Sequence, residues 1–462
     1  MIERINGILS GLFLPMLLLA AGLFYAVRLR FFHLVRPLAI IKVLTKKSRG
    51  GVSPFRSLTL ALAGTLGVGN IVGVASAIAL GGAGAVFWMW VSSFAAMLLK
   101  YAEVVLGVRY RKRVNGAHRG GAPYYIKEGL GKRGFPALGG TIAATFCVLC
   151  LLQSLTTGCS IQSAAVASAL AGVMKVPSGL CGLLLASVCA VLLVKGSGTV
   201  MRVTEVLVPV MCGGFLFLSL WCMAVRPSEI LPSLWRIFCE AFCPESAAAG
   251  VGGFLLSDAI RFGTMRGLLS NEAGCGTSPF AHAAADTDSP TEQGFWGIFE
   301  VFVDTVLLCT VTAVVILMNF EVASAYAERP MMMAIRAYSA AFGGAWKGIV
   351  EGFLGVSILC FGFATLICWA QYGVACVDFL TPKKGPRLLY IGLFSLAIYW
   401  GAVAVQGFVW SVADLVIALM MLLHVPILCL FSGEVFYETA SYFGWKVKKL
   451  SLTKGEKCGK IK

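Results

Sequence analysis

Charged residues are scarce in this chain of 462 residues. Asp, Glu, Lys and Arg together make up 13% of it, against about 25% in soluble domains. Hydrophobic residues make up 58%, and the mean hydropathy is +0.85. This composition excludes an ordinary soluble protein and predicts an all-α polytopic membrane protein.

Patterns for catalysis and for tight metal binding are also lacking. The chain has four histidines and contains neither an H-E-x-x-H nor a G-x-S-x-G motif, so the sequence predicts no enzyme and no cofactor. Most of the sixteen cysteines lie singly in apolar segments, where cysteine behaves as a small hydrophobic residue. The C-x-x-C pair Cys147 and Cys150 lies among apolar neighbours as well. We interpret the cysteines as structural.

Apolar runs recur along nearly the whole chain. Each contains about 18 or more residues, which is enough to span roughly 30 Å of hydrocarbon. We predict about eleven transmembrane helices, at 8–27, 56–80, 85–108, 138–172, 178–194, 203–225, 246–266, 294–318, 348–371, 387–406 and 410–431. The first run lacks a small-residue cleavage site. We therefore interpret it as a transmembrane helix that remains in the protein, and not as a signal peptide that is removed.

The net charge of +16 is explained by how basic residues are distributed between the two sides of the membrane. With eleven spans and an outer N-terminus, Lys and Arg on the inner side outnumber those on the outer side by about four to one, as the positive-inside rule requires. The basic residues concentrate in 28–56, in 109–133 and in the tail. We therefore predict a plasma-membrane protein with its N-terminus outside and its C-terminus in the cytoplasm.

Two glycine clusters suggest an internal repeat. One lies at Gly64–Gly69 and the other at Gly250–Gly253, in the first and sixth of the ten helices that follow the leading one. Paired interruptions of this kind are typical of transporters built from inverted repeats. We predict a leading helix and basic segment (1–50), two five-helix repeats (51–226 and 227–431) and a basic cytoplasmic tail (432–462).

The first cluster carries polar residues as well as glycine. Each glycine costs a helix about 1 kcal/mol relative to alanine, so the helix breaks easily there. A broken membrane helix offers N–H groups to a carboxylate and C=O groups to a hard cation. The alternative is close helix packing, since Gly69 and Gly73 form a G-x-x-x-G pattern. Thr65 and Asn70 favour a binding site, because packing does not need them.

Several long stretches resemble a known family. The segments AGTLGVGN, GGAPYYI, RGLLSNEAGCGTSPFAHAAADTD and FEVFVDTVLLCT are similar to those of the bacterial and archaeal alanine/glycine:cation symporters, also called sodium:alanine symporters. The resemblance runs from about residue 50 to 431. It implies a LeuT-type 5+5 inverted repeat with one additional N-terminal helix, and import of a small neutral amino acid with sodium by alternating access.

The resemblance also implies a binding site. The carbonyls of Ala63 and Leu66 and the hydroxyl of Thr365 would hold one sodium ion, and the Thr65 carbonyl with the Asn70 side chain a second. The N–H groups of Val68 and Gly69 would receive the substrate carboxylate, with Gln162 as its polar partner. Thr65, in the same segment, would also contact the substrate. The remaining substrate-facing residues would be Gly252, Gly253 and Phe254.

Four positions depart from the family pattern: Cys159, Ala164, Ala364 and His424. They leave open the exact amino acid, its D or L form, and the choice between sodium and proton. The alternatives are a proton-coupled or different small-solute symporter on the same fold and, in another class, a channel or ligand sensor. A monomer is compatible with the sequence.

Other polar residues lie in or near the predicted helices. We interpret Glu103 and Lys100 as a structural ion pair, and Glu300 with Asp304 as candidates for gating or cation coupling. Arg266 is assigned to an inner gate network together with Asp258 and Arg261. The segment SNEAGCG (270–276) is interpreted as a packed cytoplasmic element of that gate.

Overall fold

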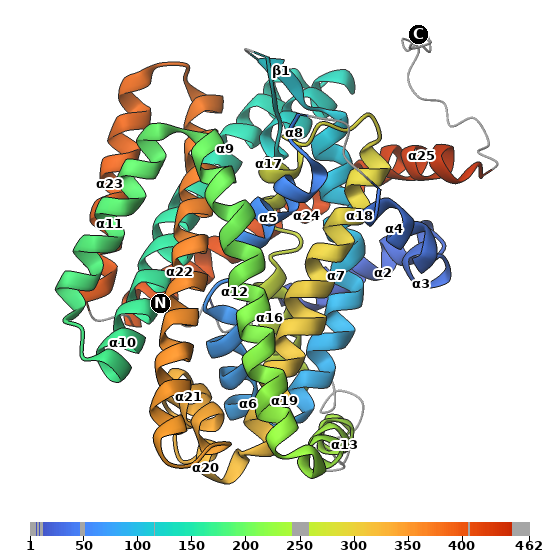
Figure 1. The fold of residues 1–462 in the computed structure, drawn as a ribbon. Coiled ribbons are helices and arrows are strands. Elements are labelled where there is room, and N and C mark those ends of the chain that lie inside the picture. Colours follow the sequence, from blue (N-terminus) through green and yellow to red (C-terminus); the bar gives the residue numbers. More distant parts are fainter. Residues whose placement is uncertain are drawn as a thin grey trace.

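The structure is a computed structural model that describes residues 13–46, 51–114, 116–242, 258–404 and 407–445, together with Asn6 and Leu9. Helices make up almost all of this part of the chain (Figure 1). A single hairpin is formed by β1 (Lys112–Val114) and β2 (Ala117–Arg119), which pair antiparallel with Arg113 opposite His118.

The helices of the first half begin near the N-terminus and include two π-helical stretches, η2 and η3. They are α2 (Leu14–Arg28), α3 (Phe32–Val35), α4 (Pro37–Leu44), α5 (Pro54–Thr65), η2 (Gly69–Gly73), α6 (Val74–Gly81), α7 (Gly84–Arg109), α8 (Ala122–Lys132), α9 (Pro136–Leu155), η3 (Thr156–Ile161), α10 (Gln162–Met174), α11 (Ser178–Lys195) and α12 (Ser197–Val225).

The helices of the second half include one 3₁₀ turn, η4, and one π-helical stretch, η5. They are η4 (Pro227–Glu229), α13 (Ile230–Ala241), α16 (Asp258–Asn271), α17 (Ser278–His282), α18 (Pro290–Val301), η5 (Phe302–Cys309), α19 (Thr310–Met318), α20 (Phe320–Ser324), α21 (Pro330–Ala340), α22 (Ala345–Leu380), α23 (Lys384–Val403), α24 (Gly407–Leu430) and α25 (Ser432–Phe443).

The expected membrane spans agree with these helices. Within the described residues, eight helices are long and apolar enough to cross a membrane, and the bent pair Pro54–Thr65 and Gly69–Gly81 makes a ninth span. The other two expected spans are represented by shorter helices, α2 with 15 residues and α16 with 14. The predicted polytopic, all-helical architecture is confirmed.

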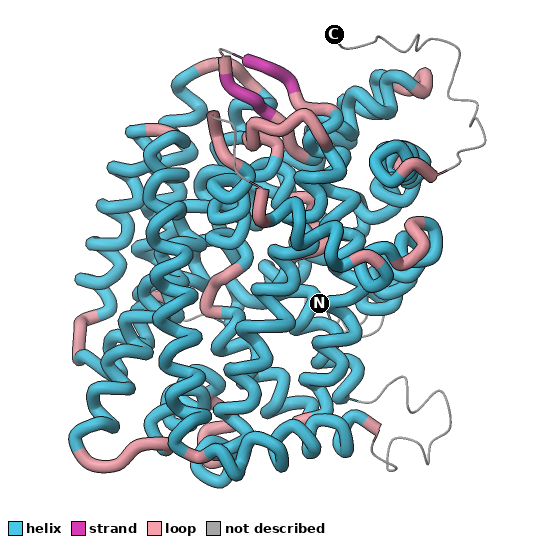
Figure 2. Tube along the Cα trace, turned by 45° about the vertical axis from the view of Figure 1, so that its right-hand side comes forward, coloured by secondary structure: helices cyan, strands magenta, loops and turns pink. Residues whose placement is uncertain are grey.

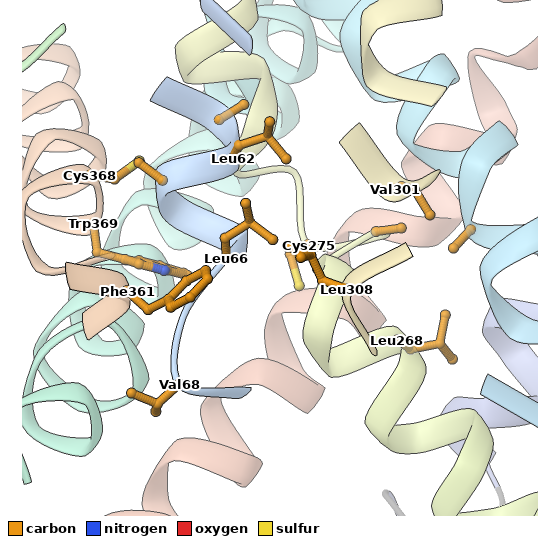
Figure 3. Close-up of a cluster of buried hydrophobic side chains, with 14 of the residues drawn as sticks. Leu62, Leu66, Val68, Leu268, Cys275, Val301, Leu308, Phe361, Cys368 and Trp369 are labelled. Atoms are coloured by element: carbon orange, nitrogen blue, oxygen red, sulfur yellow. The ribbon is translucent and has the colours of Figure 1, made fainter. Parts of the chain in front are cut away.

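The first helix break lies where the glycine cluster predicts it. α5 begins at Pro54, with the Ser53 hydroxyl accepting the N–H of Arg56 at 3.1 Å, and ends at Thr65. The chain bends by 55° before the helix resumes. Leu66, at φ −75° and ψ 73°, forms an inverse γ-turn. Figure 3 shows the non-helical connection from Leu66 to Val68.

A second break separates α16 from α17. Glu272, Gly274 and Gly276 all have positive φ, at 53°, 90° and 76°, so the helix cannot continue through them. α16 packs against α6, and α17 packs against α5. The two breaks therefore lie beside each other in the bundle. The sequence predicts a role for this segment in a cytoplasmic gate and a second break at Gly250–Gly253, which lies outside the described residues.

The two ends of the bundle differ. One end, here called the hairpin end, carries β1, β2, α8 and α25; the opposite end carries α13, α20 and α21 (Figures 1 and 2). Arg109 at the hairpin end pairs with Glu434 and Glu438 of α25. This contact anchors the C-terminal helix against α7.

Candidate functional site

A cavity of about 350 Å³ lies beside both helix breaks. One wall is the first break, including Thr65 and Gly69, and α10 contributes Gln162. Glu272 comes from the second break, and Asp414 of α24 completes the wall. The cavity thus brings together four of the residues that the resemblance implies: Thr65, Val68, Gly69 and Gln162. Gly252, Gly253 and Phe254 lie outside the described residues.

The first break leaves several carbonyl oxygens without their helical partners. In a continuous helix the N–H of Gly67 would bond to Ala63, but it bonds instead to the Thr65 oxygen at 2.8 Å. The N–H of Asn70 bonds to the Gly67 oxygen at 3.4 Å instead of to Leu66. The carbonyls of Ala63 and Leu66 therefore lose their helical partners, as a cation site requires.

Thr365 of α22 lies against one of these carbonyls. Its hydroxyl is 3.4 Å from the Leu66 oxygen and 3.1 Å from the Phe361 oxygen, and the side chain is buried. Neutral oxygen atoms gathered in this way are ligands for a hard cation. The structure thus brings Thr365 and Leu66 together, with Ala63 one turn earlier in α5.

The other side of the first break faces Gln162. Its Oε1 accepts the N–H of Val68 at 3.2 Å, and its Nε2 donates to the Thr157 oxygen at 3.3 Å. A partly negative amide oxygen thus lies where the N–H groups before η2 favour a carboxylate. Gly67 separates Gln162 from Thr365: a Cβ there would lie 3.0 Å from Gln162 Oε1 and 3.0 Å from Thr365 Oγ1.

Asn70 is fully buried and reaches η5. Its Nδ2 donates to Asp304 Oδ1 at 2.8 Å, while its Oδ1 has no hydrogen-bond partner. Asp304 Oδ2 accepts the hydroxyls of Ser270 at 2.9 Å and Thr305 at 2.7 Å. Asp304 therefore links the first break to the end of α16. This contact was not expected from the sequence, although Asp304 was a candidate for cation coupling.

Glu272 lines the cavity but is not among the binding-site residues expected from the sequence. Its Oε1 accepts the indole N–H of Trp369 at 3.2 Å, and its Oε2 accepts the Thr277 hydroxyl at 3.0 Å. Its side chain is held between α22 and the second break. The sequence feature that could have identified Glu272 is its position as an acidic residue in a polar, glycine-rich stretch between apolar runs.

Arg266 of α16 and Asp414 of α24 also line the cavity, together with Pro330 of α21. The residues of the cavity wall thus extend toward the opposite end of the bundle. Arg261 and Arg266 line a smaller neighbouring cavity with Asn6. The predicted gate residue Arg266 therefore faces the candidate site itself.

A second cavity of about 470 Å³ lies at the hairpin end, lined in part by His118, Phe280 and Tyr372. Between the two cavities α5 and α22 are in close contact, since a Cβ on Gly64 would lie 3.0 Å from both Cys368 Sγ and Tyr372 Oη. Figure 3 shows Cys368 and Trp369 facing this region. Cavities on both sides of a closed contact fit a carrier that opens to one side at a time.

The chain is similar to known transporters over nearly its whole length. The model of the "Sodium:alanine symporter family" matches residues 1–455. The sodium/alanine symporter AgcS of Methanococcus maripaludis is 33% identical over 450 residues, covering 96% of both chains. A Bacillus subtilis protein described as a probable sodium/glutamine symporter, GlnT, is 33% identical and covers 96% of this chain and 91% of its own.

The fold is also found among solved structures. MhsT in complex with L-phenylalanine superimposes with a TM-score of 0.61 at 13% identity, covering 87% of this chain and 94% of that one. A similarity at this identity establishes the fold alone. The predicted LeuT-type fold is confirmed.

Proposed function

The chain belongs to the sodium:alanine symporter family, and on that premise we propose that it imports small neutral amino acids, alanine and glycine, together with sodium. Family membership makes it a sodium-coupled amino-acid symporter in the plasma membrane and a transporter rather than an enzyme. The choice of alanine and glycine and the roles of individual residues are our proposal.

The observation that carries the proposal is the first helix break. The carbonyls of Ala63 and Leu66 have lost their helical partners on the side of Thr365, and the N–H of Val68 points to Gln162 on the other side. One short segment therefore offers oxygen ligands to sodium and N–H donors to a carboxylate. In the proposed complex, the substrate carboxylate replaces Gln162 Oε1 at Val68 and extends to Gly69.

A second sodium ion is proposed beside Asn70. The unpartnered Oδ1 of Asn70 supports this site, as does the neighbouring carboxylate of Asp304, which forms no ion pair among the described residues. The Thr65 carbonyl, which accepts the Gly67 N–H, is the third proposed ligand. Asp304 extends the ligand set that the resemblance implies.

Coupling follows from the shared segment. Sodium bound at Leu66 and Thr365 fixes the break, so the N–H groups of Val68 and Gly69 are already in place for the carboxylate. The two ligands then raise each other's affinity by the same factor. Alternating exposure of the cavity near α21 and the cavity at the hairpin end moves both across the membrane.

We propose that the hairpin end faces the cytoplasm. Basic residues concentrate there: Arg109 and Arg133 pair with Glu434 of α25, and Arg119 of β2 and Arg387 both approach Asp378, as the positive-inside rule requires. The N-terminus is then outside, the C-terminus is cytoplasmic, and the cavity beside α21 faces outward.

The test is uptake of labelled alanine into proteoliposomes. An imposed inward sodium gradient should drive accumulation, and dissipating the gradient with a sodium ionophore should abolish it. Uptake driven by a proton gradient but not by sodium would contradict the proposal. Counterflow of labelled alanine against unlabelled alanine distinguishes a carrier from a channel.

The side chain of the substrate needs its own measurement, because the glutamine relative is as similar in identity as the alanine one. A competition panel should include glycine, both alanine enantiomers, serine and glutamine. We expect glycine and alanine to compete best. If glutamine competes best, the substrate assignment is wrong while sodium coupling still holds.

A further inference from the structure

Five ionisable side chains form a second buried cluster on the hairpin side of the second break. Lys100 and Glu103 lie on α7 and Glu300 on α18, and each is 0% exposed. His282 and His424 are also 0% exposed. Glu272, at the wall of the cavity, adds a third carboxyl group to this region. The proposed sodium and substrate sites use none of the first five.

Lys100 is paired with Glu300 and not with Glu103, in contrast to the pairing expected from the sequence. Its Nζ is 3.4 Å from Glu300 Oε1 and donates to the Ser278 hydroxyl at 2.7 Å. Ser278 in turn donates to Glu300 at 2.8 Å, and His282 lies 3.0 Å from its Oε2. Glu300 is thus the ionised partner of Lys100.

Hydrogen bonds account for both histidines as neutral rings. His424 Nδ1 lies 2.8 Å from the Gly274 oxygen, which can only accept, so Nδ1 carries a proton and, in a neutral ring, Nε2 accepts from the Tyr125 hydroxyl. The same Nδ1 is 3.6 Å from Glu103 Oε1. His282 Nδ1 accepts from Gln293 Nε2 at 2.8 Å, so its Nε2 donates to Glu300. Lys100 therefore balances the charge of Glu300, and neither Glu103 nor Glu272 has a cation of its own in this cluster.

The hydrogen bonds of Glu103 differ between its two oxygens. Oε1 accepts the N–H groups of Gly274 at 2.8 Å and Gly276 at 3.0 Å, whereas the buried Oε2 has no partner. Each oxygen of Glu272, in contrast, accepts a hydrogen bond. A buried carboxylate with an unpartnered oxygen and no cation of its own is costly, and protonation of that oxygen removes the charge.

Charged and titratable groups on several elements interact with Glu103. They are Lys100 on α7, Glu300 on α18, Glu272 and Cys275 in the second break, His424 on α24, Tyr125 on α8 and Tyr25 on α2. Within the described residues, Lys100 is the sole cation in this set. Its ammonium group already forms an ion pair with Glu300.

We propose that Glu103 is a proton-binding site of this transporter. Its carboxyl group holds one proton on Oε2 while the segment 272–277 packs against it, and releases that proton to water when the segment withdraws. The donors to Oε1 come from the same break whose first residue, Glu272, lines the substrate cavity. Protonation is thereby linked to movement of the cavity wall, in addition to the sodium coupling proposed above.

Infrared spectroscopy of the purified, full-length protein tests the site directly. Near pH 7, where a solvated glutamate is ionised, wild type should show the C=O stretching band of a protonated carboxyl group. Glu103→Gln should lose one carboxyl equivalent of that band. The contribution of Glu103 to the band should remain in Glu272→Gln and in Glu128→Gln, the latter a control on the exposed ion pair with Lys112.

Persistence of the full band in Glu103→Gln, or its loss in Glu272→Gln alone, would overturn the proposal. Gln is a neutral isostere of protonated Glu and keeps an acceptor for Gly274 and Gly276. Glu103→Gln should therefore unfold within a few degrees of wild type; a variant that cannot be purified while Glu272→Gln can would also contradict the proposal. The band needs no transport, so this result is independent of the uptake assay.

Discussion

Replacing Gly67 with alanine should weaken sodium binding more than it weakens the fold. The added Cβ would lie 3.0 Å from both Gln162 Oε1 and Thr365 Oγ1, closer than the 3.5–4.0 Å or so of a favourable contact. Gly67 is not among the glycines with positive φ, so alanine fits the backbone. The perturbation is therefore a wedge between the proposed sodium ligand and the proposed carboxylate partner.

The size of the effect on sodium binding follows from the contact between Thr365 and Leu66. Thr365 Oγ1 is already 3.4 Å from the Leu66 oxygen, so a further displacement of roughly half an ångström removes it from that carbonyl. Losing an interaction with a charged ligand costs about 1.5–3 kcal/mol. The sodium concentration for half-maximal uptake should then rise about ten- to a hundredfold.

The assay is the sodium dependence of alanine uptake in proteoliposomes. Gly73→Ala is the matched control, because a Cβ at Gly73 meets nothing within 4 Å on the same segment. Gly73→Ala should keep the sodium dependence of wild type. If folded Gly67→Ala has the same half-saturating sodium concentration as the control, the first sodium site is not between Leu66 and Thr365.

Thr365→Ala should raise the half-saturating sodium concentration about tenfold or more, whereas Thr365→Ser, which keeps the hydroxyl, should restore it; equal values for both would exclude the hydroxyl as a ligand. Lys100→Met should lower the free energy of unfolding by about 3–5 kcal/mol, because its buried carboxylate partner is left unpaired, and an unchanged midpoint in detergent would refute that pairing. Gly158→Ala places a Cβ 2.4 Å from Trp369 Cγ and should cost about 1–3 kcal/mol; Gly140→Ala, with nothing within 4 Å, should unfold no earlier than wild type.

The sequence predicted the first break because its cause is local. Glycine lowers helix propensity at the residues where it occurs, so Gly64–Gly69 could be identified without tertiary information. The second break has the same cause at Gly274 and Gly276, but it follows polar residues that resemble a loop after a completed helix. The break expected at Gly250–Gly253 lies outside the described residues and stays a prediction.

Long-range pairings could not be predicted in this way. Glu103 is three positions from Lys100 on one helix and was the obvious partner, yet the bundle brings Glu300 to Lys100 and the second break to Glu103. Asn70 meets Asp304 at a separation of 234 residues. Such contacts depend on how the helices pack, and a single sequence does not encode that visibly. The repeat boundary at 226–227 stays a prediction.

The buried pair of Lys100 and Glu300 has a consequence for biosynthesis. α7 leaves the ribosome well before α18 and carries Lys100 in its apolar span, where its charge costs insertion about 2.5–3.5 kcal/mol. The partner carboxylate does not yet exist when α7 meets the translocon. α7 must therefore be retained next to the translocation machinery, or held by its neighbours α2 and α6, until the second half of the chain arrives. Fragments that end before α18 should be substrates for membrane quality-control proteases.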